Sequence, residues 1–253
     1  MISKRLLASW SLSLGALGAC ALRPPANPPA PGFDLAGSDA RAMRIADEVM
    51  EALGGRAAWD ATRVIAWTFF GRRSHVWDKA TGEYRLVDGE RLVRMNLRTM
   101  RGRAFVGGVE VTDPAQLAGT LDEARSIWIN DSYWLLMPYK LQDSGVKLRH
   151  AGEAALADGR AADVLELTFR DVGDTPENKY EVLVSRDRRL VEEWRFFTQA
   201  SDAEPRFSTP WADWRPYGRI LLSGERGGER RLTDIAVLDA PPPDFDRLPP
   251  EGH

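Results

Sequence analysis

The sequence has 253 residues, a formal net charge of −3 and a single cysteine, Cys20. The slightly acidic balance argues against nucleic acid as a partner, because binding to phosphate backbones calls for a basic protein face. One cysteine excludes an intramolecular disulfide, so the fold has to be stabilised by its hydrophobic core.

The N-terminus has the pattern of a bacterial lipoprotein signal. Lys4 and Arg5 precede an uncharged, mostly apolar run over residues 6–19, which is shorter than the roughly 20 residues of a membrane span. The segment LGAC, which ends at Cys20, resembles a bacterial lipobox, in which the cysteine is lipidated and becomes the new N-terminus. We predict a signal peptide over 1–19; an ordinary secretory signal followed by a chance cysteine is the alternative.

The residues after Cys20 predict the location of the protein and a tether. Ala21 follows the cysteine, whereas an aspartate there would, by resemblance to Gram-negative lipoproteins, favour the inner membrane. We therefore expect an outer-membrane lipoprotein that faces the periplasm. The stretch LRPPANPPAPG is typical of an extended tether. The predicted organisation is a lipidated tether over 20–37, one domain over 38–240 and a disordered proline-rich tail over 241–253.

Two helices are predicted within the domain. Ser38 is a suitable N-cap, and apolar residues over 42–53 recur at helical spacing before a glycine pair. An Asp-Pro pair at 113–114 predicts the start of a second, short helix that ends near Ser126.

Most of the remaining domain alternates between apolar and polar residues, which predicts antiparallel strands. The alternation begins near Val64, and a turn at residues 80–82 predicts a hairpin. Further strands are predicted over residues 93–97, 146–150, 163–170, 180–186, 190–198, 219–224 and 231–238. Because one face of this sheet is apolar, we predict an α+β fold that is mainly antiparallel β. Its sheet would be a curled, unclosed half-barrel with the two helices as a lid.

The segment IWINDSYWLLMPYKL, residues 127–141, follows neither the helical nor the strand period. Asn130, Asp131 and Ser132 are predicted to turn the backbone through side-chain hydrogen bonds, and the residues after them to form an irregular crossing segment. Its aromatic residues, Trp134 among them, would either fill the open end of the sheet as core or line a lipid-sized cavity.

The order of these segments resembles a known family. The segments EALGG, AAWDATRVIAWTFFG and IWINDSYWLLMPYKL, with a run of strands between them, are similar to uncharacterised bacterial envelope lipoproteins. These look like distant members of the lipoprotein-carrier (LolA/LolB-like) superfamily, and the likeness covers roughly Asp39 to Leu238. It implies an acyl-chain cavity whose lid consists of the helices around Ile45 to Leu53 and Leu117 to Ala124. The implied ligand-binding residues are Trp67, Phe69, Trp77, Trp134, Leu136, Trp194 and Phe196.

The sequence offers little for catalysis or metal binding. Its histidines are His75, His150 and His253, and the H-E-x-x-H, C-x-x-C, G-x-S-x-G and phosphate-loop patterns do not occur. We predict no catalytic residue, no metal and no cofactor. A hydrolase that uses His75 with Asp78 or Glu83 is the weakest alternative.

The leading hypothesis is a non-enzymatic, lipid-anchored envelope protein that binds an apolar ligand, such as the acyl chains of a lipid or lipoprotein. Burial alone would supply the affinity, at about 25 cal/mol per Å² of apolar area. The alternative is an envelope scaffold or stress sensor whose core is filled by its own aromatic residues, with Trp67 and Trp134 in contact. Arginines near strand ends, such as Arg188 and Arg189, would form a solvated rim or contact anionic lipid headgroups.

Overall fold

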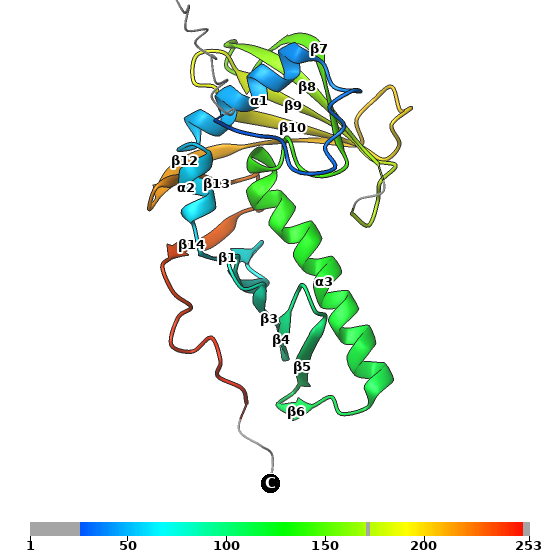
Figure 1. Cartoon of the computed structure of the whole chain (residues 1–253), viewed down its shortest axis with the longest axis vertical. Helices are drawn as coiled ribbons and strands as arrows, with labels where there is room; N and C mark the ends of the chain where they lie inside the picture. Colours follow the sequence, from blue (N-terminus) through cyan, green and yellow to red (C-terminus); the bar gives the residue numbers. More distant parts are fainter. Residues whose placement is uncertain (1–25, 171–172, 250–253) are drawn as a thin grey trace, which may run out of the picture.

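The computed structural model describes residues 26–170 and 173–249 of the chain. Figure 1 shows an elongated molecule with two lobes, one above the other, and the long helix α3 running diagonally from the lower lobe to the upper one. Each lobe is built on an antiparallel sheet, and neither sheet closes into a barrel. The predicted α+β fold with unclosed antiparallel sheets is confirmed, although the strands form three sheets and not one.

The lower sheet has seven strands in the order β14-β1-β2-β3-β4-β5-β6. Its strands are β1 (Val64–Phe69), β2 (Arg73–Asp78), β3 (Glu83–Asp88), β4 (Arg91–Asn96), β5 (Arg101–Val106), β6 (Val109–Glu110) and β14 (Leu232–Leu238). Consecutive strands pair as hairpins, including the predicted hairpin between β2 and β3. The last strand, β14, pairs with the first strand, β1, so the first and last strands of the domain are neighbours in this sheet.

The upper sheet has five strands in the order β11-β10-β9-β8-β7. Its strands are β7 (Val146–Ala155), β8 (Ala161–Phe169), β9 (Lys179–Ser185), β10 (Val191–Phe197) and β11 (Phe207–Pro210). A separate hairpin of β12 (Ala212–Tyr217) and β13 (Ile220–Glu225) connects this sheet to β14.

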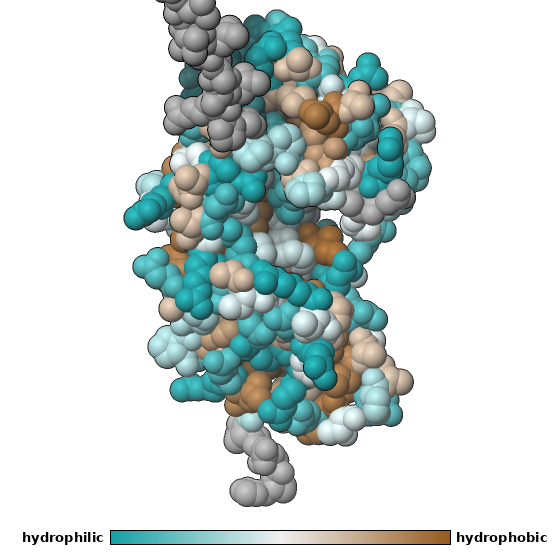
Figure 2. All heavy atoms as spheres, viewed as in Figure 1, coloured by the Kyte–Doolittle hydropathy of each residue, from teal (hydrophilic) through white to brown (hydrophobic). Residues whose placement is uncertain are grey.

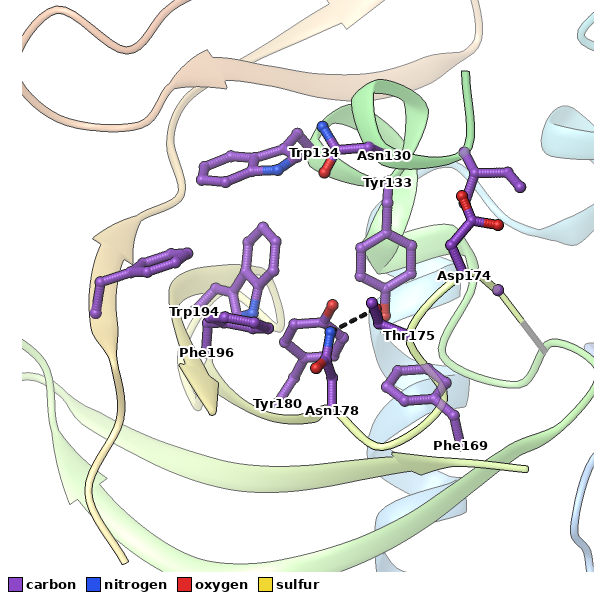
Figure 3. Close-up of a pocket in the computed structure, with 13 residues that line it drawn as sticks. Asn130, Tyr133, Trp134, Phe169, Asp174, Thr175, Asn178, Tyr180, Trp194 and Phe196 are labelled. Carbon is purple, nitrogen blue, oxygen red and sulfur yellow. Dashed lines mark hydrogen bonds between the residues drawn. The ribbon is translucent and has the colours of Figure 1, made fainter. Parts of the chain in front are cut away.

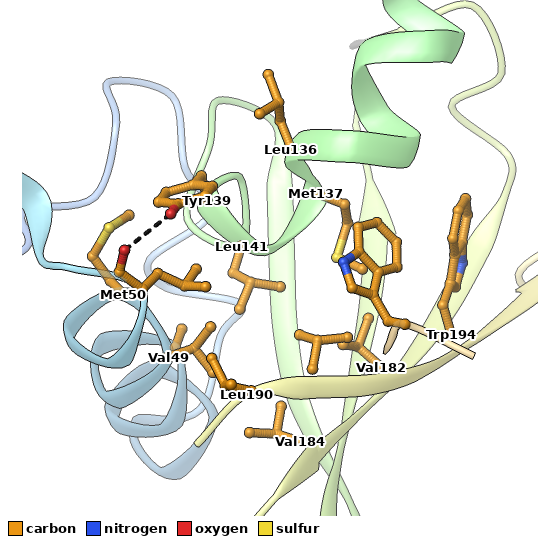
Figure 4. Close-up of a cluster of buried hydrophobic side chains, with 14 of the residues drawn as sticks. Val49, Met50, Leu136, Met137, Tyr139, Leu141, Val182, Val184, Leu190 and Trp194 are labelled. Carbon is orange, nitrogen blue, oxygen red and sulfur yellow. Dashed lines mark hydrogen bonds between the residues drawn. The ribbon is translucent and has the colours of Figure 1, made fainter. Parts of the chain in front are cut away.

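Helix α1 (Ala40–Ala52) covers one face of the upper sheet, and the short helix α2 (Arg56–Ala61) follows it. The N-cap is Asp39, whose carboxylate accepts a hydrogen bond from the Ala42 amide at 2.7 Å, one residue after the predicted cap. Val49 and Met50 face Val182, Val184 and other apolar residues in the core (Figure 4). The amphipathic stripe of the sequence therefore forms the helix–sheet interface.

Helix α3 (Pro114–Leu136) is longer than predicted and continues into a single 3-10 turn, η1 (Met137–Tyr139). Its start is as predicted, since Asp113 caps it by accepting from the Gln116 amide at 2.9 Å. The predicted turn at residues 130–132 is wrong. Asp131 instead accepts two hydrogen bonds from Arg73 of β2, at 2.6 and 2.8 Å, which keeps the helix continuous over the lower sheet.

Segments on both sides of the predicted domain also pack against it. Before α1, the Ala30 amide donates to the Gln142 carbonyl at 2.9 Å, and Phe33 is buried. After β14, Phe245 is buried within the segment predicted to be a disordered tail. The predicted signal peptide and Cys20 lie outside the described residues. Among the helices of the described residues, none has the length and apolar character needed to cross a bilayer.

Candidate functional site

A cavity of about 470 Å³ lies between the C-terminal half of α3 and the face of the upper sheet. Figure 3 shows aromatic side chains from both elements pointing into it, and Figure 2 shows the molecular surface hollowed between the lobes on the right. We call it the aromatic cavity. It is lined by Ile129, Asn130, Tyr133, Trp134, Phe169, Gly173, Asp174, Thr175, Asn178, Tyr180, Trp194, Phe196 and Phe207.

The secondary structure determines which residues reach the aromatic cavity. Residues 129, 130, 133 and 134 share one face of α3, because positions three and four apart are neighbours on a helix. On the upper sheet, Phe196 lies directly opposite both Tyr180 of β9 and Phe207 of β11. Three adjacent strands therefore present a row of rings to the same helix face.

Most of the aromatic rings pack edge to face or tilted against one another, and the rings of Trp134 and Phe207 are stacked. Trp134 and Trp194 have ring centroids 4.7 Å apart at 61°, and Tyr133 lies 5.4 Å from Tyr180. Such arrangements are favourable for aromatic pairs and hold each ring in a defined orientation. The walls of the aromatic cavity are therefore stabilised without a ligand.

A small number of polar groups interrupt the aromatic wall. The side-chain amide of Asn178 donates to Thr175 Oγ1 at 2.6 Å, and the cavity is also lined by Asn130 of α3 and by Asp174 of the loop between β8 and β9. Burial raises the pKa of Tyr133 well above its usual value of 10.0, so its phenol stays neutral. Apolar walls with a few polar groups are typical of sites for small molecules and lipids.

Three of the seven predicted ligand-binding residues, Trp134, Trp194 and Phe196, line the aromatic cavity. Phe69 lies outside it, with its ring 6.3 Å from that of Trp134. The other three are also elsewhere: Trp67 stacks on His75, Trp77 packs against Trp128, and Leu136 is buried in the core.

The sequence interpretation missed four aromatic residues of the cavity: Tyr133, Phe169, Tyr180 and Phe207. Phe169 and Tyr180 belong to strands whose alternation was visible, so their face could have been assigned with their neighbours. Phe207 belongs to β11, which has four residues and too short a pattern to recognise. Tyr133 was hidden because the helix was expected to end before it.

Neither of the predicted lid segments covers the aromatic cavity. The apolar residues of α1 are buried against the upper sheet, whereas Leu121 and Ala124 of α3 pack into a separate core on the lower sheet. The part of α3 that does line the cavity lies one to three turns further along the chain.

His75 is buried in a polar cluster that differs from the predicted one. Its Nδ1 atom lies 2.8 Å from Tyr84 Oη, and its Nε2 atom lies 3.0 Å from Asp131 Oδ2. Asp78 accepts hydrogen bonds from Arg63, and Glu83 accepts one from Arg94. The three residues of the hydrolase alternative are therefore not brought together. Within residues 26–170 and 173–249, no group of three or more His, Cys, Asp or Glu side chains could hold a metal ion.

Comparisons with known proteins give structural neighbours only. No protein-family model and no curated protein matches the sequence. A DUF1329 family protein from Desulfovibrio piger has 13% identity and a TM-score of 0.43, with 81% of this chain and 96% of that chain covered. A putative outer membrane lipoprotein-sorting protein domain from Vibrio parahaemolyticus has 9% identity, the same TM-score of 0.43 and the same coverage of 81% and 96%.

A more distant neighbour is found in the MucA/MucB complex of Pseudomonas aeruginosa, with 19% identity, a TM-score of 0.25 and coverage of 79% and 59%. Because all of these likenesses are loose, the function proposed below rests on the aromatic cavity.

Proposed function

We propose that this protein binds the acyl chain of a lipid or lipoprotein, or a similar apolar ligand, in the aromatic cavity. The observation that carries the proposal is the volume and lining of that cavity: about 470 Å³, with walls made mainly of aromatic side chains. A volume in this range is typical of sites that enclose a small ligand. Burial of apolar surface at about 25 cal/mol per Å² would supply the affinity without a reacting group.

The same geometry weighs against the scaffold alternative. That alternative requires the core to fill the space itself, with Trp67 and Trp134 in contact across it. Trp67 instead stacks on His75 at 4.5 Å, while Trp134 packs against Trp194 on the wall of an open cavity. Among the ring pairs of the described residues, none joins Trp67 to Trp134.

The test is native mass spectrometry of the full-length protein purified from a bacterial envelope fraction, compared between two charge-introducing variants. Phe207→Asp places a carboxylate in the aromatic cavity, whereas Ser208→Asp places one on the neighbouring, exposed position of the same strand. We expect adducts of lipid mass in the parent and in Ser208→Asp, and their loss in Phe207→Asp.

Circular dichroism has to show that both variants remain folded. A parent protein without adducts that also fails to bind a fluorescent polyene fatty acid would exclude the proposed function. Equal adducts in the two variants would show that the lipid binds elsewhere on the chain.

We also propose that Cys20 is lipidated after removal of residues 1–19, which places the domain at the envelope, on the periplasmic side of the outer membrane. The support is the lipobox-like sequence before Cys20. Labelling of cells with radioactive palmitate is expected to mark the parent protein and not Cys20→Ser. A label retained by Cys20→Ser would refute the anchor and leave the cavity proposal untouched.

A further inference from the structure

A second cleft lies on the upper lobe, away from the aromatic cavity, and has a different chemistry. It has a volume of about 350 Å³ and is lined by Arg41, Arg44, Ile45, Glu48, Asp163, Arg186 and Arg189. We call it the arginine cleft. Arg41, Arg44 and Glu48 lie on one face of α1, since they are spaced three and four residues apart, and the other polar residues come from the upper sheet and its turns.

Asp163 holds the arginines in place from the floor of the arginine cleft. Its side chain is 5% exposed and lies 2.9 Å from Arg41, 3.1 Å from Arg186 and 3.2 Å from Arg189. Burial raises the pKa of Asp163, but hydrogen bonds from Arg186, His150 and Arg41 outweigh it and hold the pKa far below its usual value. The carboxylate therefore remains ionised and fixes three guanidinium groups around one opening.

N–H donors of the arginine side chains remain available to a ligand after these contacts. Each guanidinium has five N–H groups, and Asp163, Glu153 and Glu48 occupy only some of them. Arg44 is exposed and makes no ion pair or hydrogen bond with the described residues. Four arginines in the arginine cleft thus stand against three carboxylates in or beside it, and the arginine without an ion pair to the described residues, Arg44, is exposed. Arginine forks match the oxygen atoms of phosphate groups.

The proposed anchor limits how far α1, which lines the arginine cleft, can lie from the membrane surface. Asn27, near the start of the described chain, donates to Asp47 of α1 at 3.0 Å. Cys20 precedes Asn27 by seven residues, which span about 25 Å at most when fully extended. If Cys20 carries the proposed lipid anchor, the part of the upper lobe next to Asp47 of α1 cannot move far from the membrane surface.

We propose that the arginine cleft binds the phosphate group of an anionic membrane lipid at the surface to which the chain is tethered. The choice of a lipid as the source of the phosphate rests on the proposed anchor, whereas the phosphate chemistry rests on the arginine cleft alone. Binding there would orient the upper lobe towards the bilayer, which a lipid anchor on an extended tether does not do by itself.

The test compares Arg44→Gln with Arg101→Gln in the full-length protein. Arg44 has no partner whose charge would be left uncompensated, and Arg101 is a matched exposed arginine on β5 of the other lobe. Partition is measured on phosphatidylcholine vesicles and on vesicles that contain equal amounts of phosphatidylcholine and phosphatidylglycerol. We expect Arg44→Gln to weaken binding to the anionic vesicles about fivefold, and Arg101→Gln to leave it unchanged.

Two further measurements separate the sources of the phosphate and the role of the anchor. Calorimetric titration of the protein with inorganic phosphate, without vesicles and against a chloride control of the same ionic strength, is expected to show no saturable binding at millimolar phosphate. Saturable binding that is lost in Arg44→Gln would show that free phosphate is the ligand. Cys20→Ser is expected to lower binding to both kinds of vesicle and to retain the dependence on Arg44. Equal effects of the two arginine variants, or no preference for anionic vesicles, would overturn the proposal while leaving lipid binding in the aromatic cavity open to its own test.

Discussion

Asp131 lies fully buried between α3 and the lower sheet, with Arg73 and Asn130 donating to its carboxylate. Burial raises its pKa, and the contacts with His75, Arg73 and Asn130 outweigh this, so that the pKa lies below its usual 3.8. We expect Asp131→Asn to lower the free energy of unfolding by about 3 kcal/mol, because Arg73 loses a partner for its half-buried charge.

The control for this substitution is Glu123→Gln on the same helix, whose exposed carboxylate pairs with Arg91 at 2.7 Å. An exposed pair contributes about 1 kcal/mol or less, so the loss there has to be much smaller. Urea unfolding followed by circular dichroism measures both. Equal losses would mean that the Arg73–Asp131 contact does not stabilise α3.

His75 makes the stability depend on pH. Burial lowers its pKa below the usual 6.5, against the opposing effect of Asp131. Since the unfolded chain then binds the proton more tightly, the contribution of His75 is complete above pH 6.5 and is lost as the pH falls towards the folded pKa. We expect the free energy of unfolding to decrease between about pH 7 and pH 5, and His75→Gln to flatten that slope. An unchanged slope in the variant would assign the pH dependence to other groups.

At the scale of elements, α3 shows which features sequence patterns predict correctly and which they do not: its start was predicted, and its length was not. The Asp-Pro start was readable because capping is a local property, whereas Asn, Asp and Ser in sequence favour turns locally. The partner that overrides this preference, Arg73, lies 58 residues away and cannot be inferred from the pattern. The same holds for the aromatic cavity: alternation assigned Trp194 and Phe196 to one face, but only the full length of α3 brings Tyr133 opposite them.

The C-terminal end of α3 depends on Arg226, which follows β13. Its guanidinium is buried, stacks 3.6 Å from the Trp211 ring and donates to the Trp134 carbonyl at 2.7 and 3.2 Å. Its remaining donors reach the Ser223 hydroxyl and the carbonyls of Ser223 and Glu225, so neutral acceptors surround the charge. The planar fork that makes all of these bonds cannot be reproduced by lysine.

We therefore expect Arg226→Lys to lower the free energy of unfolding by about 3 kcal/mol, since carbonyl acceptors are left unpaired. Because Trp134 also lines the aromatic cavity, binding of a fluorescent fatty acid should weaken as well. Arg219→Lys, at an exposed position on the preceding turn, is the control and should change neither quantity. A stable Arg226→Lys protein with unchanged binding would contradict this role.

At the scale of the whole molecule, the main core extends through both lobes, because it contains Ile65 and Trp67 of the lower sheet beside residues of the upper sheet. Trp77 and Trp128 pack against both this core and the smaller core of the lower sheet, and α3 contributes buried residues to each. The aromatic cavity lies where α3 crosses from one lobe to the other. The position of its walls therefore depends on the packing of α3 against both lobes. No single stretch of sequence encodes such a junction, which is why its lining could be predicted only in part.

The extent of the domain can be tested at its C-terminal segment. Phe245 is 3% exposed, Arg94 lies 3.8 Å above its ring, and Arg94 also donates to its carbonyl and to Asp246. If residues 241–249 belong to the folded domain, Phe245→Ala should lower the free energy of unfolding by about 3 kcal/mol, as expected for a buried aromatic residue. Arg247→Ala, at an exposed neighbouring position, should change it by less than about 0.5 kcal/mol. Urea unfolding of the two variants decides between a packed segment and a tail, because in a tail neither substitution would change the free energy of unfolding.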